Sequence, residues 1–304
     1  MITVLWSLLP IFALIAGGFL LRAVFIRSET AWRLVEKSAY YVLFPSLLIV
    51  TLSRLRFDVG TLAPLLAITS ASLIIVAAFL LVFRARLPFD GPSFSSIFQG
   101  AIRYNTYVGL SAASAVYGES GIAMMALLAA AMIPTVNVLS VYVLTRFASH
   151  KGFSWQTTFG ELVKNPLILS ALAGLSLSAF QMQLPAIVAD ILGALGKASL
   201  PLGLLAVGAG LNLTSISGHS RPIVLGSVLK LLVLPSLVWG MGVLASIDPV
   251  HLAVAVLYSS LPTASSAFIL ARELGGDHSL MASIITVQTM LAFLTMPVIL
   301  LFHL

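Results

Sequence analysis

Long apolar runs alternate with short charged or turn-rich breaks along the whole chain. Ten of these runs have roughly the 20 apolar residues that a helix needs to cross a membrane. They lie near residues 2–21, 34–53, 62–83, 94–117, 121–145, 165–182, 186–212, 222–245, 249–271 and 279–302. The pattern predicts an all-α membrane protein with ten transmembrane helices, which passes through the lipid bilayer many times.

The composition agrees with a membrane protein. Of the 304 residues, 60% are hydrophobic and 9% are charged, and the mean hydropathy is +1.09, whereas an ordinary soluble domain has about 25% charged residues. The sixteen Lys and Arg are spread singly between apolar runs. Nucleic-acid binding needs a dense basic face, so no nucleic-acid partner is expected. The chain has no cysteine, which excludes disulfides and thiolate metal ligands.

The placement of Lys and Arg predicts the orientation of the chain. Connections after odd-numbered runs contain ten of these residues, whereas connections after even-numbered runs contain only Arg54 and Arg56. Because Lys and Arg near the ends of spans favour the cytoplasmic side, the odd connections are expected in the cytoplasm. Both termini are then outside, and the membrane is the cell (cytoplasmic) membrane.

Three runs have counterparts at a nearly constant distance along the sequence. PIFALIAGG in the first run matches PLILSALAG in the sixth, and the proline of FPSLL matches that of LPLGLL, both at an offset of 156 residues. Residues 105–118 match residues 262–275 at an offset of 157. The matches predict two five-helix units, 1–146 and 165–304, joined by a polar connection at 147–164. Since five is odd, the repeats are inverted, which is typical of secondary transporters; a duplicated bundle without a transport role is the alternative.

The fourth and ninth runs carry polar residues where an inverted repeat places a substrate site. In SSLPTASS, residues 259–266, Pro262 removes a backbone donor and disfavours helix before it. The matching residue is Asn105, whose amide can bind a carboxylate or an unwound backbone. Both helices are expected to break and to expose N–H groups that attract anions, with a simple kink as the alternative at Pro262. The candidate substrate-binding residues are Arg103, Tyr104, Asn105, Thr106, Ser260, Pro262, Thr263 and Ser265.

Ionisable and polar residues inside apolar runs are further candidates. Lys197 and Lys230 are expected to keep the pathway positive and to attract an anion; bonding to a nearby carbonyl or snorkelling is the alternative. Glu36 and Asp190 are the carboxylates that could carry a coupling proton, with an interfacial position as the alternative. Gln288 is a weaker coupling candidate, for which a hydrogen bond between helices is the alternative.

Motifs for enzyme activity are missing from the sequence. HExxH, GxSxG and P-loop patterns do not occur, and the five histidines fall in connections or at the C-terminal end. No enzyme activity, cofactor or metal site is expected, and H⁺ and Na⁺ both stay open as coupling ions.

Four segments together resemble the auxin efflux carrier family, in the superfamily that also holds the bile acid sodium symporters. They are FPSLL (44–48), NTYVGL…YG (105–118), KNPLILSALAG (164–174) and LPTASSAFILARELG (261–275). The resemblance implies that helices 1, 2, 6 and 7 form a scaffold, and that helices 3–5 and 8–10 form an elevator-like transport domain. In that domain helices 4 and 9 are broken and cross. The resemblance also implies that Asn105 meets the substrate carboxylate and that Pro262 marks the second crossover.

The sequence departs from the plant members of this family in two places. Their long cytoplasmic loop is reduced here to 147–164, and the run 62–83 has no charged residue, although the plant carriers have ionisable groups near that region. The regulation and proton linkage of the plant carriers are therefore not expected here.

The expected function is secondary active transport of a small organic anion by alternating access. The substrate classes are a carboxylate such as malonate and an auxin-like weak acid. An anion channel and a membrane-embedded ligand sensor are the alternative functions, and a homodimer through the scaffold helices is the candidate assembly.

Overall fold

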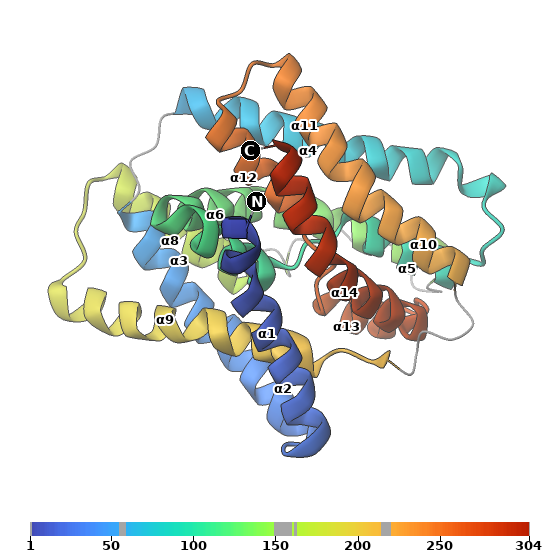
Figure 1. Ribbon diagram of the computed structural model, residues 1–304, viewed down its shortest axis with the longest axis horizontal. Coiled ribbons are helices and arrows are strands. Elements are labelled where there is room, and N and C mark those ends of the chain that lie inside the picture. The colour runs from blue at the N-terminus through green and yellow to red at the C-terminus, as the bar shows by residue number, and fades with distance from the viewer. Residues whose placement is uncertain (1, 55–58, 149–159, 161–162, 214–219, 304) are drawn as a thin grey trace. The chain divides into compact units, whose positions relative to one another are not determined.

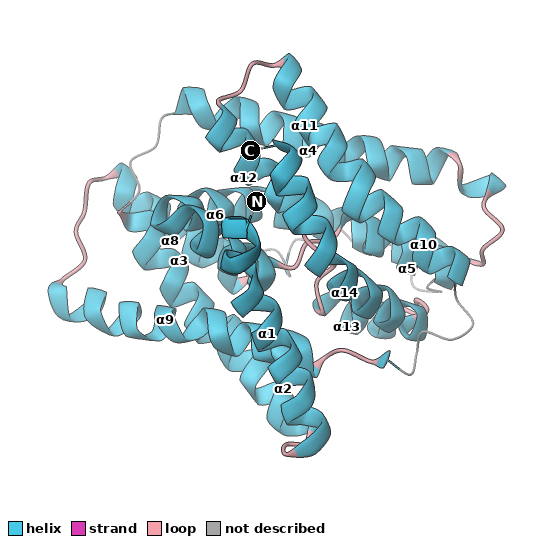
Figure 2. Cartoon of the chain, viewed as in Figure 1, coloured by secondary structure: helices cyan, strands magenta, loops and turns pink. Residues whose placement is uncertain are grey.

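The computed structural model describes residues 2–54, 59–148, 160, 163–213 and 220–303, and no strand occurs in these residues (Figure 2). The connection predicted at 147–164 lies almost wholly outside the described residues, as does Arg56. The helices are α1 (Ile2–Val24), α2 (Glu29–Ser38), η1 (Ala39–Leu43), α3 (Phe44–Ser53), α4 (Val59–Val82), η2 (Arg84–Arg86), α5 (Gly91–Ile102), α6 (Thr106–Phe147), α8 (Pro166–Ala179), α9 (Ala186–Ala209), α10 (Ser220–Val228), η4 (Leu229–Val233), α11 (Leu234–Leu244), α12 (Pro249–Ser259), α13 (Ser266–Glu273) and α14 (His278–His303).

Seven helical stretches among the described residues are long and apolar enough to cross a membrane. They are Trp6–Val24, Glu29–Ser53, Leu62–Val82, Gly91–Phe147, Ala186–Ala209, Ser220–Leu244 and His278–Leu301, and the apolar helices α8 and α12 are shorter. The structure therefore agrees with an all-α membrane protein, while the count of ten spans stays a prediction.

The fourth predicted run covers α5 and the first part of α6, and the fifth covers the rest of α6. The sequence predicts a short connection near residues 118–120, and the structure has a break there: α6 consists of two helices that meet in a kink at Gly118, where φ is 63° and ψ is −148°. Side chains other than hydrogen rarely fit this backbone region, so glycine allows the change of direction without a loop.

The chain divides into two compact units. Unit 1 comprises Met1–Val59, Tyr107–Ile133 and Phe159–Gly210, and unit 2 comprises Gly60–Thr106, Pro134–Thr158 and Leu211–Leu304. In unit 1, α9 packs against α1 and α3, and α3 also packs against α8 (Figure 1). In unit 2, α10 packs against α5 and α14, and α11 packs against α12.

The contact between α1 and α9 depends on glycine. A Cβ atom at Gly18 would lie 2.0 Å from the carbonyl oxygen of Leu205, and one at Gly208 would lie 1.8 Å from that of Ile15. Both distances are far below van der Waals contact. Small residues allow membrane helices to approach each other this closely, so the glycine that the first run shares with the sixth has a packing role here.

Two helices contain a wide π turn directly before a proline. The N–H of Phe44 bonds to the carbonyl of Ala39 before Pro45, and η4 ends in the same way before Pro235. Proline lacks an N–H, and its ring clashes with the carbonyl four residues earlier, which the wider turn accommodates. Proline is tolerated in membrane helices, so the prolines by themselves do not reveal the π turns.

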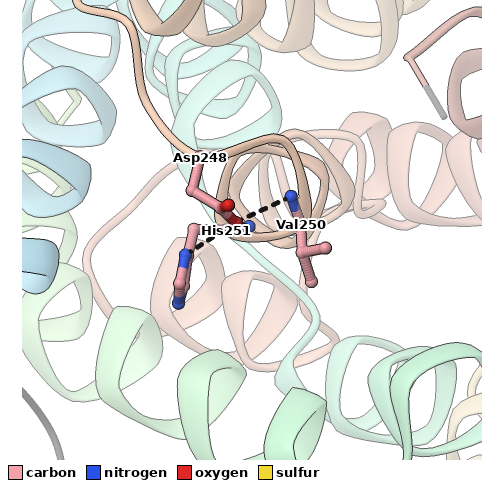
Figure 3. Close-up of polar contacts among 3 residues, drawn as sticks. All are labelled: Asp248, Val250 and His251. Atoms are coloured by element: carbon pink, nitrogen blue, oxygen red, sulfur yellow. Dashed lines mark hydrogen bonds and ion pairs between the residues drawn. The ribbon is translucent and has the colours of Figure 1, made fainter.

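Two aspartates cap helices in unit 2. Asp90 Oδ1 accepts from the N–H of Ser93 at 2.9 Å at the start of α5. Asp248 Oδ1 accepts from the N–H groups of Val250 (3.0 Å) and His251 (3.2 Å) at the start of α12, and lies 2.9 Å from His251 Nδ1 (Figure 3). The backbone N–H of His251 is the largest cause that lowers the pKa of Asp248, and the hydrogen bonds of Ser93 lower the pKa of Asp90.

Candidate functional site

Unit 2 contains two helix breaks, at the positions that the sequence predicts. α5 ends at Ile102 and α6 begins at Thr106, so three residues between them are not helical. α12 and α13 are separated by residues 260–265. Pro262 lies in the second gap, where it can continue no helical hydrogen bond, and Asn105 directly precedes α6, at a position where asparagine is favoured as a helix cap.

A backbone hydrogen bond joins the two breaks. The N–H of Asn105 donates to the carbonyl oxygen of Pro262 at 2.8 Å. Asn105 is 1% exposed, and the three residues from Leu261 to Thr263 are buried as well. Two segments that are 157 residues apart in sequence therefore meet in the interior of one unit.

Gln288 on α14 makes hydrogen bonds to backbone groups at both breaks. Its Oε1 accepts from the backbone N–H of Thr263 at 3.0 Å, and its Nε2 donates to the carbonyl oxygen of Gly100 at 2.9 Å. The Thr263 hydroxyl lies 2.7 Å from Gln288 Oε1 and 2.8 Å from the Gly100 carbonyl oxygen, and its single proton serves one of them at a time. Gln288 thus satisfies backbone groups that the two breaks remove from their helices.

Two basic side chains lie at the breaks. Arg103 is 8% exposed, and its Nη2 donates to the hydroxyl of Ser266, the first residue of α13, at 3.2 Å. Lys230 is fully buried in the π turn η4, and its Nζ lies 3.4 Å from the ring centroid of Tyr104. The ring of Tyr104 in turn packs against that of Tyr258 with centroids 4.3 Å apart. π turns occur frequently at functional sites.

Several buried polar atoms near these residues have no hydrogen-bond partner among the described residues. They are both amide atoms of Gln99, the hydroxyls of Tyr104 and Tyr258, and Nζ of Lys230. Buried polar groups are normally bonded, so a group of them beside a helix break is typical of a ligand site. Gln99 and Tyr258 are absent from the sequence-based candidates. The available signal was their position, because each lies within four residues of a break.

The acidic side chains of unit 2 that the structure describes all lie at helix ends. Asp90 and Asp248 cap α5 and α12, Glu273 is the last residue of α13, and Asp277 directly precedes α14. Among the described residues near the breaks, the ionisable side chains are therefore the basic ones of Arg103 and Lys230. In addition, α6 and α13 begin next to the breaks, and the N-terminal end of a helix favours an anion.

The remaining candidates in unit 2 have simpler surroundings. The hydroxyl of Ser260 donates to the carbonyl of Leu257 in its own helix at 2.8 Å. Ser265 directly precedes α13 and makes no side-chain cap bond, and Thr106 is the half-buried first residue of α6. These three residues lie at the breaks, but none of these contacts joins one break to the other.

The other charged candidates belong to unit 1. Glu36 lies half-buried on α2, and Asp190 and Lys197 lie exposed on α9, where both line a cavity of that unit. The structure therefore brings together the candidates from both breaks with Lys230 and Gln288, and it groups Asp190 with Lys197 elsewhere. Among the described residues, no three His, Asp or Glu side chains lie close enough to hold a metal ion.

The apolar helices and the polar, bonded helix breaks define a multi-pass integral membrane protein. Comparison with known proteins shows which family it resembles. Residues 153–300 match the family model described as "Membrane transport protein". An "Uncharacterized transporter" of Methanothermobacter thermautotrophicus is 24% identical over 295 residues, which are 96% of this chain and 95% of the relative. The match confirms the resemblance, seen in the sequence, to the auxin efflux carriers, which form a membrane transport protein family. It is a family of transporters.

Proposed function

We propose that this protein is a secondary transporter that moves a small organic anion, of the carboxylate class, across the cell membrane by alternating access. One observation carries the proposal. The two helix breaks are joined by the hydrogen bond between Asn105 and Pro262, and the basic side chains of Arg103 and Lys230 lie beside them. The aspartates and glutamates that the structure describes in unit 2 lie at helix ends instead.

The geometry suits a carboxylate for physical reasons. A carboxylate accepts hydrogen bonds only, and the breaks offer the Asn105 amide, the N-terminal N–H groups of α6 and α13, and the planar guanidinium of Arg103. Charge-assisted bonds from arginine to carboxylates are among the strong ones. A negative ligand would favour the ammonium form of the buried Lys230, because an anion offsets the cost of holding that charge away from water.

The transport cycle we propose uses the predicted inverted repeats. Ten spans with both termini outside would place the breaks near the middle of the bilayer, and helices 3–5 and 8–10 would move as an elevator against a scaffold of helices 1, 2, 6 and 7. A homodimer through those scaffold helices would hold the scaffold fixed. H⁺ and Na⁺ are the candidate coupling ions, and Glu36, Asp190 and Gln288 are the candidate coupling residues.

Ligand binding to the purified protein tests the proposal first. A thermal-shift screen of mono- and dicarboxylates should raise the apparent melting temperature for at least one acid, because a ligand that binds only the folded state stabilises it. The uncharged amide of the same acid is the control and should give no shift. If no anion shifts the melting temperature and none is transported, the proposal is wrong.

Flux in proteoliposomes then separates a transporter from its alternatives. The acid found in the screen, radiolabelled, should exchange against unlabelled acid inside the vesicles, and Arg103→Gln should reduce this exchange at least about tenfold. Unitary currents in planar bilayers would show a channel instead, and binding without any exchange would show a sensor.

A further inference from the structure

Lys230 is buried in unit 2, where no described side chain pairs with it as a counter-ion. It belongs to the π turn η4, between α10 and α11, and is 0% exposed. Its Nζ has no hydrogen-bond partner among the described residues. The ion pairs within 4.0 Å in the same residues are Arg33–Glu29 and His251–Asp248. The amine therefore lacks both contacts, a counter-ion and a hydrogen bond, that stabilise a buried charge.

The helices packed against η4 bring no acid to this amine. They are α5, α10, α11 and α14. α5 and α11 contain no ionisable side chain. α10 has Arg221 as its second residue, and α14 has His278 and His303 as its first and last residues. None of these three side chains is an acid, so none can pair with an ammonium.

The helix breaks add aromatic and basic groups around Lys230. Its Nζ lies 3.4 Å from the ring centroid of Tyr104, and the ring of Tyr258 packs against that of Tyr104. Phenol groups carry no charge at neutral pH. An aromatic face stabilises an ammonium far less than its removal from water costs. Arg103 in the first break carries a charge of the same sign, so a carboxylate has to supply the missing counter-ion.

We infer, on the basis of the proposed transport of a carboxylate, that Lys230 carries the proton that is coupled to this transport. The amine is neutral in the empty site. A proton and a carboxylate enter from the same side of the membrane, and the nitrogen lone pair binds the proton to form an ammonium beside the carboxylate. On the other side the carboxylate leaves, and the ammonium returns its proton to water. One proton thus crosses with each anion, and no bond of the substrate breaks.

The cost of a buried charge makes the coupling strict. A lone charge in the hydrocarbon region is expensive, so the site returns empty without the proton, and it crosses loaded with the ammonium paired. Lys230 also belongs to the same unit as both breaks, whereas the carboxylates of Glu36 and Asp190 belong to unit 1. The proton and the anion can therefore bind to one unit and move with it.

Proton uptake on binding tests the coupling. Isothermal titration calorimetry in buffers of different ionisation enthalpy counts the protons, with malonate as the probe; the acid with the largest thermal shift replaces it if malonate does not bind. At pH 8, where the free acid is ionised, the wild type should take up about one proton per anion bound. Its dissociation constant should rise about tenfold per pH unit between pH 7.5 and pH 9, because the complex holds one more proton than the free protein.

The possible failures of this experiment are distinct. If an acid binds but no proton is taken up, the transport proposal stands and the coupling through Lys230 is wrong. If no acid of the screen binds or is transported, the proposed function is wrong, and the proton carrier is overturned with it.

A lysine variant tests where the proton binds. Lys230→Arg keeps a positive charge that does not titrate, so anion binding in this variant should take up no proton and should not depend on pH. Lys164→Arg, at an exposed lysine, is the matched control and should keep the proton uptake of the wild type. If Lys230→Arg does not fold, the remaining affinity of Lys230→Met gives the same test. Proton uptake by either folded Lys230 variant would place the proton elsewhere, for example on Glu36, Asp190 or the bound acid.

Flux in proteoliposomes tests the coupling during transport. An acidic exterior should drive accumulation of radiolabelled malonate by the wild type and by Lys164→Arg, and a protonophore should abolish it. Protein-free vesicles are the control for passive entry. In Lys230→Arg, accumulation should be the same with and without the pH gradient, since a permanently charged site cannot return empty. Accumulation that follows a sodium gradient and ignores the pH gradient in the wild type would overturn the proposal.

Discussion

The ammonium group of Lys230 lies over the face of Tyr104, 3.4 Å from the ring centroid, and Tyr104 belongs to the break between α5 and α6. A cation above an aromatic face is stabilised by the ring quadrupole, by about 2 kcal/mol when both are desolvated. This is much less than the cost of removing a lone ammonium from water. The aromatic face therefore offsets only part of the cost of holding Lys230 as an ammonium in the π turn.

Lys230→Met should separate binding from stability. We expect the affinity for the transported anion to fall at least about tenfold, or about 1.4 kcal/mol, because the positive charge is lost while the volume is nearly kept. The melting temperature of the ligand-free variant should be unchanged or higher, since a buried amine without a hydrogen-bond partner among the described residues is removed. Lys164→Met, at an exposed lysine, is the control. An unaltered dissociation constant for Lys230→Met would contradict a role in binding.

Asn105 should be required for transport and not for folding. Asn105→Ala removes the amide beside the break and is expected to abolish uptake or export in proteoliposomes, with an unchanged circular dichroism spectrum. Asn105→Asp keeps a side chain that can cap α6 but adds a negative charge, so anion flux should be lost here too. Flux at the wild-type rate in Asn105→Asp would mean that the substrate anion binds elsewhere.

Two buried glutamines should respond differently to the same substitution. Gln288→Leu removes hydrogen bonds to Thr263 and Gly100 and leaves buried backbone groups without partners, so we expect a loss of about 2–4 kcal/mol in unfolding free energy. Gln99→Leu removes an amide without a partner among the described residues and should be neutral or stabilising. Equilibrium unfolding in mixed micelles measures the unfolding free energy of both variants. Equal losses would show that the hydrogen bonds of Gln288 to the two breaks do not stabilise the fold.

Adjacent glycines on α1 offer a matched test of helix packing. A Cβ atom at Gly18 would lie 2.0 Å from the backbone of Leu205, whereas one at Gly17 would lie 3.7 Å from Cδ2 of that residue, an ordinary contact. Gly18→Ala should therefore destabilise the protein by about 1–3 kcal/mol or more through overpacking. Gly17→Ala should be neutral or slightly stabilising, because alanine favours helix. Similar melting temperatures for the two variants would show that α1 and α9 are further apart.

The capping aspartates make stability depend on acid pH. Hydrogen bonds in the folded state lower the pKa values of Asp248 and Asp90 below those of the unfolded chain. Their contribution is complete above the unfolded pKa of about 3.9 and is lost as the pH falls through the lower, folded pKa. Asp248→Asn keeps a capping side chain without the titration. Its melting temperature should fall less between pH 5 and pH 3 than that of the wild type, and identical slopes would contradict this origin.

Much of the architecture follows from local sequence. Apolar runs of spanning length predict membrane helices because no water is available to bond an exposed backbone in lipid. Pro262 predicts the second break because proline cannot donate in a helix, and the repeat extends this expectation to Asn105. The first two inferences need only a residue and its neighbours in the chain, and the third needs the internal repeat as well. The structure contains both breaks.

Other features depend on contacts between distant residues. The hydrogen bond from Asn105 to Pro262 joins segments that are 157 residues apart. The hydrogen bonds of Gln288 join α14 to both breaks. No local pattern in the sequence reveals either contact. The sequence by itself determined which residues must leave a helix or enter the membrane. Only the tertiary structure decided their partners, because pairing depends on which side chains converge in space.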